Sequence, residues 1–297
     1  MTWRRALASL AVLAAVATAC ASDDEPTLEA PDSTLPSDST TPTTSGTPSS
    51  PTSGAASGTT ATTAPTTRRT IIVGGTDAVP DGGAKAVGTG SPGDGAARLL
   101  RPAGAARIVV QVLAQDGAAP PQQVLDHVRR VLADASGKPV GVVGGGTPPA
   151  RQTWSPADLR AAAVAGSRPS APDEGLIHLL FVRGSSDRGP ETLGLAVASD
   201  VVGVFSERVD DAARGLVTTT ALMDAVTLHE VGHVLGLVDL VLKTGRADPD
   251  HPGHSSNPGS VMYWAVESSV VSDLLTGGPP REFDDRDRAD LAAIRDG

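Results

Sequence analysis

Cysteine and aromatic residues are scarce in this chain of 297 residues. It has one cysteine, three Phe, three Trp and one Tyr. A single cysteine excludes a disulfide within the chain, an iron–sulfur cluster and a cysteine-based zinc module. With so few aromatic side chains, the core must be built from Val, Leu, Ile and Ala.

Positive charge is also scarce. The chain has 24 Lys and Arg against 34 Asp and Glu, which gives a net charge of −10, and no basic patch runs through the sequence. Nucleic-acid binding needs clustered cations that neutralise phosphates, so the composition argues against a nucleic-acid partner. A membrane-spanning helix needs about 20 consecutive apolar residues, and no apolar run in the sequence is that long.

Residues 1–20 have the pattern of a secretory signal peptide. Arg4 and Arg5 precede an apolar stretch over 6–19, which ends in small residues directly before Cys20. This ending resembles the lipidation site of bacterial lipoproteins, which implies a lipid anchor at Cys20 and a protein held on the membrane at the bacterial cell surface. The alternative is ordinary cleavage, which would leave a secreted protein with a free thiol.

A low-complexity segment follows the leader. Ser, Thr and Pro make up 31 of the 49 residues 22–70. Such a segment buries too little apolar surface to become ordered, so we expect residues 21–70 to be a disordered linker. For the Gly/Ala-rich segment 71–105 the sequence predicts no regular structure. The segment is a pro-segment, further linker or an extra strand, and the sequence does not decide among these three.

Residues 106–297 have the pattern of one globular domain. Runs rich in β-branched residues predict strands, and apolar residues at helical spacing predict helices. The expected strands are 107–114, 139–143, 176–182, 192–199 and 201–205, and the expected helices are 121–135, 155–164, 221–235 and 284–295. This order predicts an α+β fold whose N-terminal part is α/β.

A His-Glu-x-x-His pattern lies inside the predicted helix 221–235. Residues four apart share a helix face, so His229 and His233 can bind one zinc ion. Glu230 then lies beside the metal, and Gly236 permits a sharp exit from the helix. Two surface histidines on an amphipathic helix are the alternative. His229, Glu230 and His233 interrupt a run that is otherwise apolar and reads as buried. Burying polar side chains without a partner is costly, which disfavours this alternative.

The pattern resembles the signature of the metzincin zinc proteases, His-Glu-x-x-His-x-x-Gly-x-x-His followed by a Met-turn. Asp239 stands where the signature has its third histidine. Farther along, His254 precedes Met262 and Tyr263 with the spacing of a matrixin site, as if 239–253 were an insertion. The resemblance covers 229–263. It implies a metzincin-like fold, with a mixed twisted sheet, an active-site helix and a C-terminal helix.

The third zinc ligand stays open among three residues. His254 keeps the family spacing to Met262, Asp239 keeps the spacing from His233, and His251 is three residues from His254. The resemblance also places Met262 beneath the metal with Tyr263 next to it. In metzincins the strand before the active-site helix aligns the substrate, and 176–182 is the candidate here.

The function that the resemblance implies is a zinc-dependent endopeptidase acting on proteins or peptides. Glu230 would take a proton from the water that attacks the peptide bond. Two alternatives remain. One is a catalytically silent surface lipoprotein that binds a partner, and the other is a zinc amidase that acts on cell-wall peptides.

Overall fold

The structure is a computed structural model that describes residues 86–215, 217–269 and 278–297. The predicted leader, the predicted linker and Cys20 lie outside the described residues. Within those residues, none of the helices combines the length and the hydropathy that crossing a bilayer requires.

Five strands form one mixed sheet in the order β2–β1–β4–β7–β6. β6 runs antiparallel to β7, and the other neighbours are parallel. The strands are β1 (Arg107–Ala114), β2 (Val140–Gly144), β4 (Glu174–Val182), β6 (Gly194–Ala198) and β7 (Val201–Phe205). A separate parallel pair is formed by β3 (Thr153–Trp154) and β5 (Ser185–Ser186).

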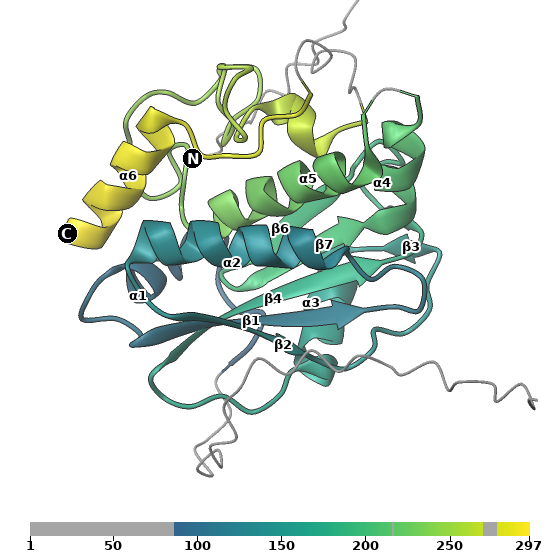
Figure 1. Cartoon of the computed structure of the whole chain (residues 1–297), viewed down its shortest axis with the longest axis horizontal. Coiled ribbons are helices and arrows are strands. Elements are labelled where there is room, and N and C mark those ends of the chain that lie inside the picture. Colours follow the sequence, from purple (N-terminus) through teal and green to yellow (C-terminus); the bar gives the residue numbers. More distant parts are fainter. Residues whose placement is uncertain (1–85, 216, 270–277) are drawn as a thin grey trace, which may run out of the picture. The chain divides into compact units, whose positions relative to one another are not determined.

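Helices cover both faces of the sheet. Figure 1 shows α2 and α5 beside each other on one face and α3 on the other. The helices are α1 (Ala96–Leu100), α2 (Gln122–Ser136), α3 (Pro156–Gly166), α4 (Ser206–Ala213), α5 (Thr219–Val234) and α6 (Asp285–Asp296), with a 3₁₀ turn η1 (Trp264–Glu267) before the last of them. Because both faces are covered, β4 is buried along its whole length.

Helix α5 is buried on all sides from Leu222 to Val234. It begins at the N-cap Thr218, whose hydroxyl accepts a hydrogen bond from the Ala221 amide at 3.2 Å. Its apolar residues pack against the sheet, against α2 and against α4. A helix that is buried on all sides can carry polar side chains only where these make hydrogen bonds or ion pairs or bind a metal ion.

The expected architecture is confirmed, with a mixed sheet, a buried helix that carries the His-Glu-x-x-His pattern, and a C-terminal helix. All nine expected elements are present with shifts of a few residues at their ends. The capping box at Ser155 and Asp158 explains why α3 begins where it does. Helix α1 lies in the segment that received no structure, and Arg101 there donates a hydrogen bond to the Ile294 carbonyl at 3.1 Å.

One expectation about the sheet is wrong. The predicted strand 176–182 cannot align a substrate chain, because β4 pairs with β1 on one side and with β7 on the other. Its backbone groups are therefore already used within the sheet. The strand at the edge next to α5 is β6, which in the described part of the chain pairs along its length only with β7.

Candidate metal centre

His229 and His233 face each other on consecutive turns of α5. Their Nε2 atoms are 3.1 Å apart, and both side chains are buried. The Nδ1 atom of His229 donates a hydrogen bond to the Val261 carbonyl at 2.7 Å. That bond fixes the tautomer, so the lone pair of His229 Nε2 points toward His233.

Both imidazoles are neutral at physiological pH. Burial is the main cause that lowers the pKa of His229 and of His233 to about 3, and the neighbouring histidine charges act in the same direction. A neutral imidazole is the form that binds a divalent metal ion. The helix therefore presents two metal-binding nitrogens without competition from protons.

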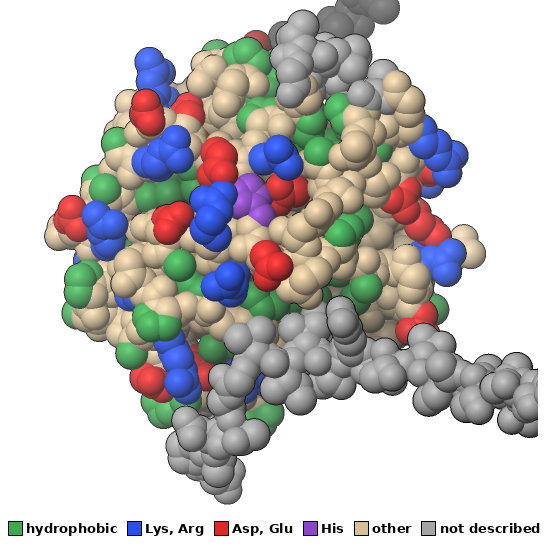
Figure 2. Space-filling view, in the orientation of Figure 1, with side chains coloured by type: hydrophobic (Ala, Val, Ile, Leu, Met, Phe, Trp, Pro, Cys, Tyr) green, Lys and Arg blue, Asp and Glu red, His purple; other side chains and the backbone are tan. Residues whose placement is uncertain are grey.

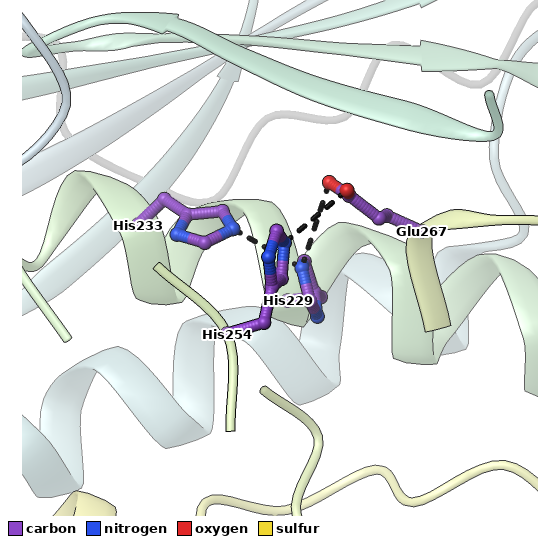
Figure 3. A group of neighbouring side chains, drawn as sticks. All are labelled: His229, His233, His254 and Glu267. Atoms are coloured by element: carbon purple, nitrogen blue, oxygen red, sulfur yellow. Dashed lines mark hydrogen bonds and ion pairs between the residues drawn. The ribbon is translucent and has the colours of Figure 1, made fainter. Parts of the chain in front are cut away.

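Two more side chains reach the same point from beyond the end of α5. The ring centroid of His254 lies 5.2 Å from that of His229 and 5.0 Å from that of His233. Glu267, at the end of η1, places Oε1 3.2 Å from His254 Nε2 and Oε2 3.7 Å from His229 Nε2. Figure 3 shows the three rings converging, with the Glu267 carboxylate directed at two of them.

These four residues fit a divalent metal ion such as zinc. One nitrogen or oxygen from each of His229, His233, His254 and Glu267 lies within 4.8 Å of all the others. Zinc takes such ligands at about 2.0–2.1 Å in a tetrahedron, which sets neighbouring ligand atoms about 3.3 Å apart. The two ring nitrogens of His254 are buried and make no hydrogen bond to any described residue. A cation at this point would be a partner for the His254 ring nitrogen that faces it.

The segment around Met262 lies against α5 between the two helix histidines. A Cβ atom added to Gly232 would overlap the Met262 sulfur, so the glycine allows this close approach. The Met262 carbonyl accepts a hydrogen bond from the Ser255 amide at 2.8 Å. This bond ties the turn to the residue after His254. Tyr263 follows, half-buried, with its ring 5.6 Å from that of Trp264.

The chain leaves α5 through Gly236, which has a φ of 84°. This is the left-handed conformation that the sequence led us to expect at the helix exit. A Cβ atom there would meet side-chain atoms of Val241 and Ala96, so only glycine fits.

The structure does not bring Asp239 to the metal centre. One of its carboxylate oxygens accepts hydrogen bonds from the amide and hydroxyl of Thr244 and from the Gly245 amide, and the other accepts from the Ala247 amide at 3.2 Å. Asp239 has a φ of 63° and closes its own loop. Its spacing from His233 matched the family pattern, but the loop takes both oxygens.

His251 is also directed away from the metal centre. Its ring stacks on Trp264 with centroids 4.3 Å apart and planes 5° apart, and its Nδ1 lies 3.3 Å from Asp248 Oδ1. Of the three residues weighed as third ligand, the structure therefore places only His254 beside His229 and His233.

Glu230 is buried next to the histidines. Its Oε2 accepts a hydrogen bond from the Ala196 amide of β6 at 2.6 Å, and its Oε1 has no partner among the described residues. Burial is the largest cause that raises the pKa of Glu230, and the charge of Glu267 raises it further. A carboxylate with one anchored oxygen and one free oxygen is suited to proton transfer.

Glu267 was not among the residues singled out from the sequence. The signal for it is its position five residues after Met262, as the only charged residue of η1. An acidic residue that ends an apolar segment this close to the Met-turn can be brought to the same centre. The family pattern ends before it and gave no reason to choose it.

Comparisons with known proteins add a likeness in fold. No family model matches the sequence, and neither does any curated protein. An archaemetzincin from Methanopyrus kandleri is similar in structure, with 15% identity and a TM-score of 0.45 over 64% of this chain and 96% of that one. A zinc-dependent peptidase from Methanocorpusculum labreanum is similar with 17% identity and a TM-score of 0.40, over 62% of this chain and 99% of that one.

Proposed function

We propose that this chain is a zinc-dependent endopeptidase of the metzincin type, in which His229, His233 and His254 would hold the zinc ion. The observation that carries the proposal is the convergence of three imidazoles, two of which burial keeps neutral, beside the buried carboxylate of Glu230. When bound, zinc would polarise the scissile carbonyl and lower the pKa of water.

In the proposed reaction, the protein contributes proton transfer by Glu230. Its free Oε1 takes a proton from the attacking water and later gives it to the leaving amine. Its Oε2 remains bound to the Ala196 amide and keeps the carboxylate in place. The raised pKa of Glu230, caused mainly by its burial, brings this group toward the range in which a general base also returns the proton.

A peptide substrate would lie along β6. This edge strand borders α5. Its Ala196 amide donates to Glu230 and its Val197 carbonyl accepts from Arg160, so an added chain would pair through the other backbone groups of β6 and pass Glu230. Addition of an extended peptide to a sheet edge is a common mode of peptide recognition.

The experiment combines metal analysis with peptide digestion. We expect the purified chain to contain one zinc ion per molecule and to cleave within a mixture of unstructured peptides, with the products read by mass spectrometry. Zinc without cleavage would favour the second candidate, a catalytically silent binding protein. That candidate has one observation in its favour, because Glu267 adds a fourth protein donor to the group.

We also propose that Cys20 carries a lipid that attaches the protein to the membrane on the outer side of the bacterial cell. The support is the order of Arg4 and Arg5, the apolar stretch and the small residues before Cys20. Labelling cells with a fatty-acid probe should mark the wild-type protein and leave the Cys20→Ser variant unmarked. Equal labelling of the two would contradict the anchor.

A further inference from the structure

We propose that Glu267 is a fourth protein ligand of the metal, which closes the centre in the resting protein and must leave it before water and substrate can bind. This inference rests on the proposed function and adds a means of regulation to the same site. Structural zinc sites have four protein ligands, whereas catalytic sites keep one position for water. A centre with a removable fourth ligand would change between these two states.

The direction of the Glu267 carboxylate supports a ligand rather than a residue that orients a histidine. A residue that orients a metal-bound histidine contacts the ring nitrogen opposite the metal. In His229 that nitrogen is Nδ1, and it already donates to the Val261 carbonyl. Glu267 instead lies 3.7 Å from His229 Nε2, the nitrogen that faces His233. Its carboxylate is therefore on the metal side of the ring.

The distances support the same assignment. Glu267 Oε1 lies 3.2 Å from His254 Nε2, and the Nε2 atoms of His229 and His233 lie 3.1 Å apart. Both values are close to the about 3.3 Å expected between two ligands of one tetrahedral zinc ion. Glu267 Oε2 lies 3.7 Å from His229 Nε2, and the donor atoms of the group lie within 4.8 Å of one another, so the side chains would have to approach one another further for a carboxylate oxygen to become the fourth ligand.

The backbone around Glu267 is attached to the segment that leads into β6. The Glu267 carbonyl accepts a hydrogen bond from the Leu193 amide at 2.8 Å, and the Ser269 amide donates to the Glu191 carbonyl at 2.9 Å. Residues 192 and 268 form a bridge between these two bonds. Because β6 is the proposed substrate strand, a peptide that binds along it would act on the segment that holds the fourth ligand.

The test uses the cobalt-substituted full-length protein, because cobalt reports coordination through its visible spectrum. The variant is Glu267→Gln, which keeps the shape of the side chain and removes its charge. The matched control is Glu191→Gln, since Glu191 is an exposed carboxylate on the attached segment that lies outside the metal-binding group. Melting of the metal-free proteins, followed by circular dichroism, verifies that all three are folded.

We expect the Glu267→Gln variant to change the cobalt spectrum, to bind zinc at least tenfold more weakly in competition with a chelator, and to bind acetohydroxamate at least tenfold more tightly. The control should match the wild type in all three measurements. An unchanged spectrum together with unchanged hydroxamate affinity would overturn the inference. Should the variant fail to fold, the wild-type protein alone decides, because tight hydroxamate binding to it would contradict a closed centre.

The same measurements separate this inference from the proposed function. The expected spectral changes in a protein that cleaves no peptide would support Glu267 as a ligand and contradict the peptidase. Cleavage by a protein whose spectrum is insensitive to Glu267→Gln would support the peptidase and contradict the ligand. A protein that binds no metal would contradict both.

Discussion

Gly194 of β6 lies directly against Glu230 of α5. A Cβ atom on residue 194 would be 2.7 Å from Glu230 Oε1 and 2.8 Å from its Cγ, and it would be as close as 2.7 Å to Val226. The absence of a side chain at this position lets the carboxylate reach the Ala196 amide at 2.6 Å. Glu230, which we propose as the general base, is thus positioned by the strand along which we place the substrate.

The Gly194→Ala substitution should therefore displace Glu230. A displacement of about 1 Å at a catalytic group can lower the rate about 100-fold, so we expect kcat to fall by that order. Overpacking should also lower the free energy of unfolding by about 1–3 kcal/mol. The zinc content should not change. Peptide cleavage measures kcat, urea unfolding measures the free energy of unfolding, and metal analysis measures the zinc content.

The matched control is Gly141→Ala in β2, because a Cβ atom at residue 141 would meet nothing within 4 Å. This variant should keep both its kcat and its stability. If Gly194→Ala is as active as this control, Glu230 does not depend on the close approach of β6.

The Glu230→Gln substitution tests the general base itself. The amide keeps the size of the side chain but cannot accept a proton from water, so kcat should fall about 10²- to 10⁴-fold. Because the three histidines are unchanged, the variant should bind zinc with the affinity of the wild type. The measurements are peptide cleavage and metal analysis of the same sample. Unchanged turnover would refute the role given to Glu230.

The sequence predicted the part of the centre that depends on local structure. His229 and His233 are four residues apart on a helix, so their proximity follows from helical geometry alone. The left-handed Gly236 after the helix is local in the same sense. The alternation of strands and helices likewise predicted the α+β class of the fold, because burial patterns within each element carry that information, whereas the mixed sheet was implied only by the resemblance to metzincins.

The sequence could not decide the residues that arrive through tertiary structure. Asp239 and His254 were both compatible with a known spacing, and only the hydrogen bonds of the loop show that the Asp239 carboxylate is already used. Glu267 is brought in through backbone contacts with residues 191–193, which are more than 70 positions away in the chain. No periodicity within one segment encodes such a contact.

The third ligand can be identified by comparing two substitutions. His254→Ala removes a nitrogen from the centre, so zinc affinity should fall at least tenfold. Asp239→Ala removes a carboxylate that accepts four hydrogen bonds within its loop, and we expect it to lower the free energy of unfolding by about 1–3 kcal/mol while zinc stays bound. Zinc competition and urea unfolding measure these effects. The opposite pattern, with zinc lost only from the Asp239 variant, would contradict the assignment.

A cluster of charged side chains around His127 joins α2, α5 and the segment before α6. His127 Nδ1 lies 2.7 Å from both carboxylate oxygens of Asp224, and its Nε2 lies 3.1 Å from Glu282 Oε1. Arg130 contacts the same Glu282 oxygen at 2.5 Å, and Arg281 lies 3.9 Å from Asp224. Figure 2 shows acidic and basic side chains lying next to one another on this face, over α2 and α5.

This cluster should make the stability of the protein depend on pH. The hydrogen bond with Asp224 is the largest cause that raises the pKa of His127, against an opposing effect of burial. A group whose pKa is higher in the folded state stabilises that state fully below its unfolded pKa of about 6.5. The stabilisation is lost as the pH rises through the folded pKa.

The wild type should therefore exceed the His127→Gln variant in free energy of unfolding by more at pH 5.5 than at pH 9. Urea unfolding of both metal-free proteins across this range measures the difference. His229 and His233 also titrate differently on unfolding, but they are present in both proteins, so their contribution cancels in the comparison. A difference that stays constant or grows with pH would show that the ion pairs of His127 do not stabilise the fold.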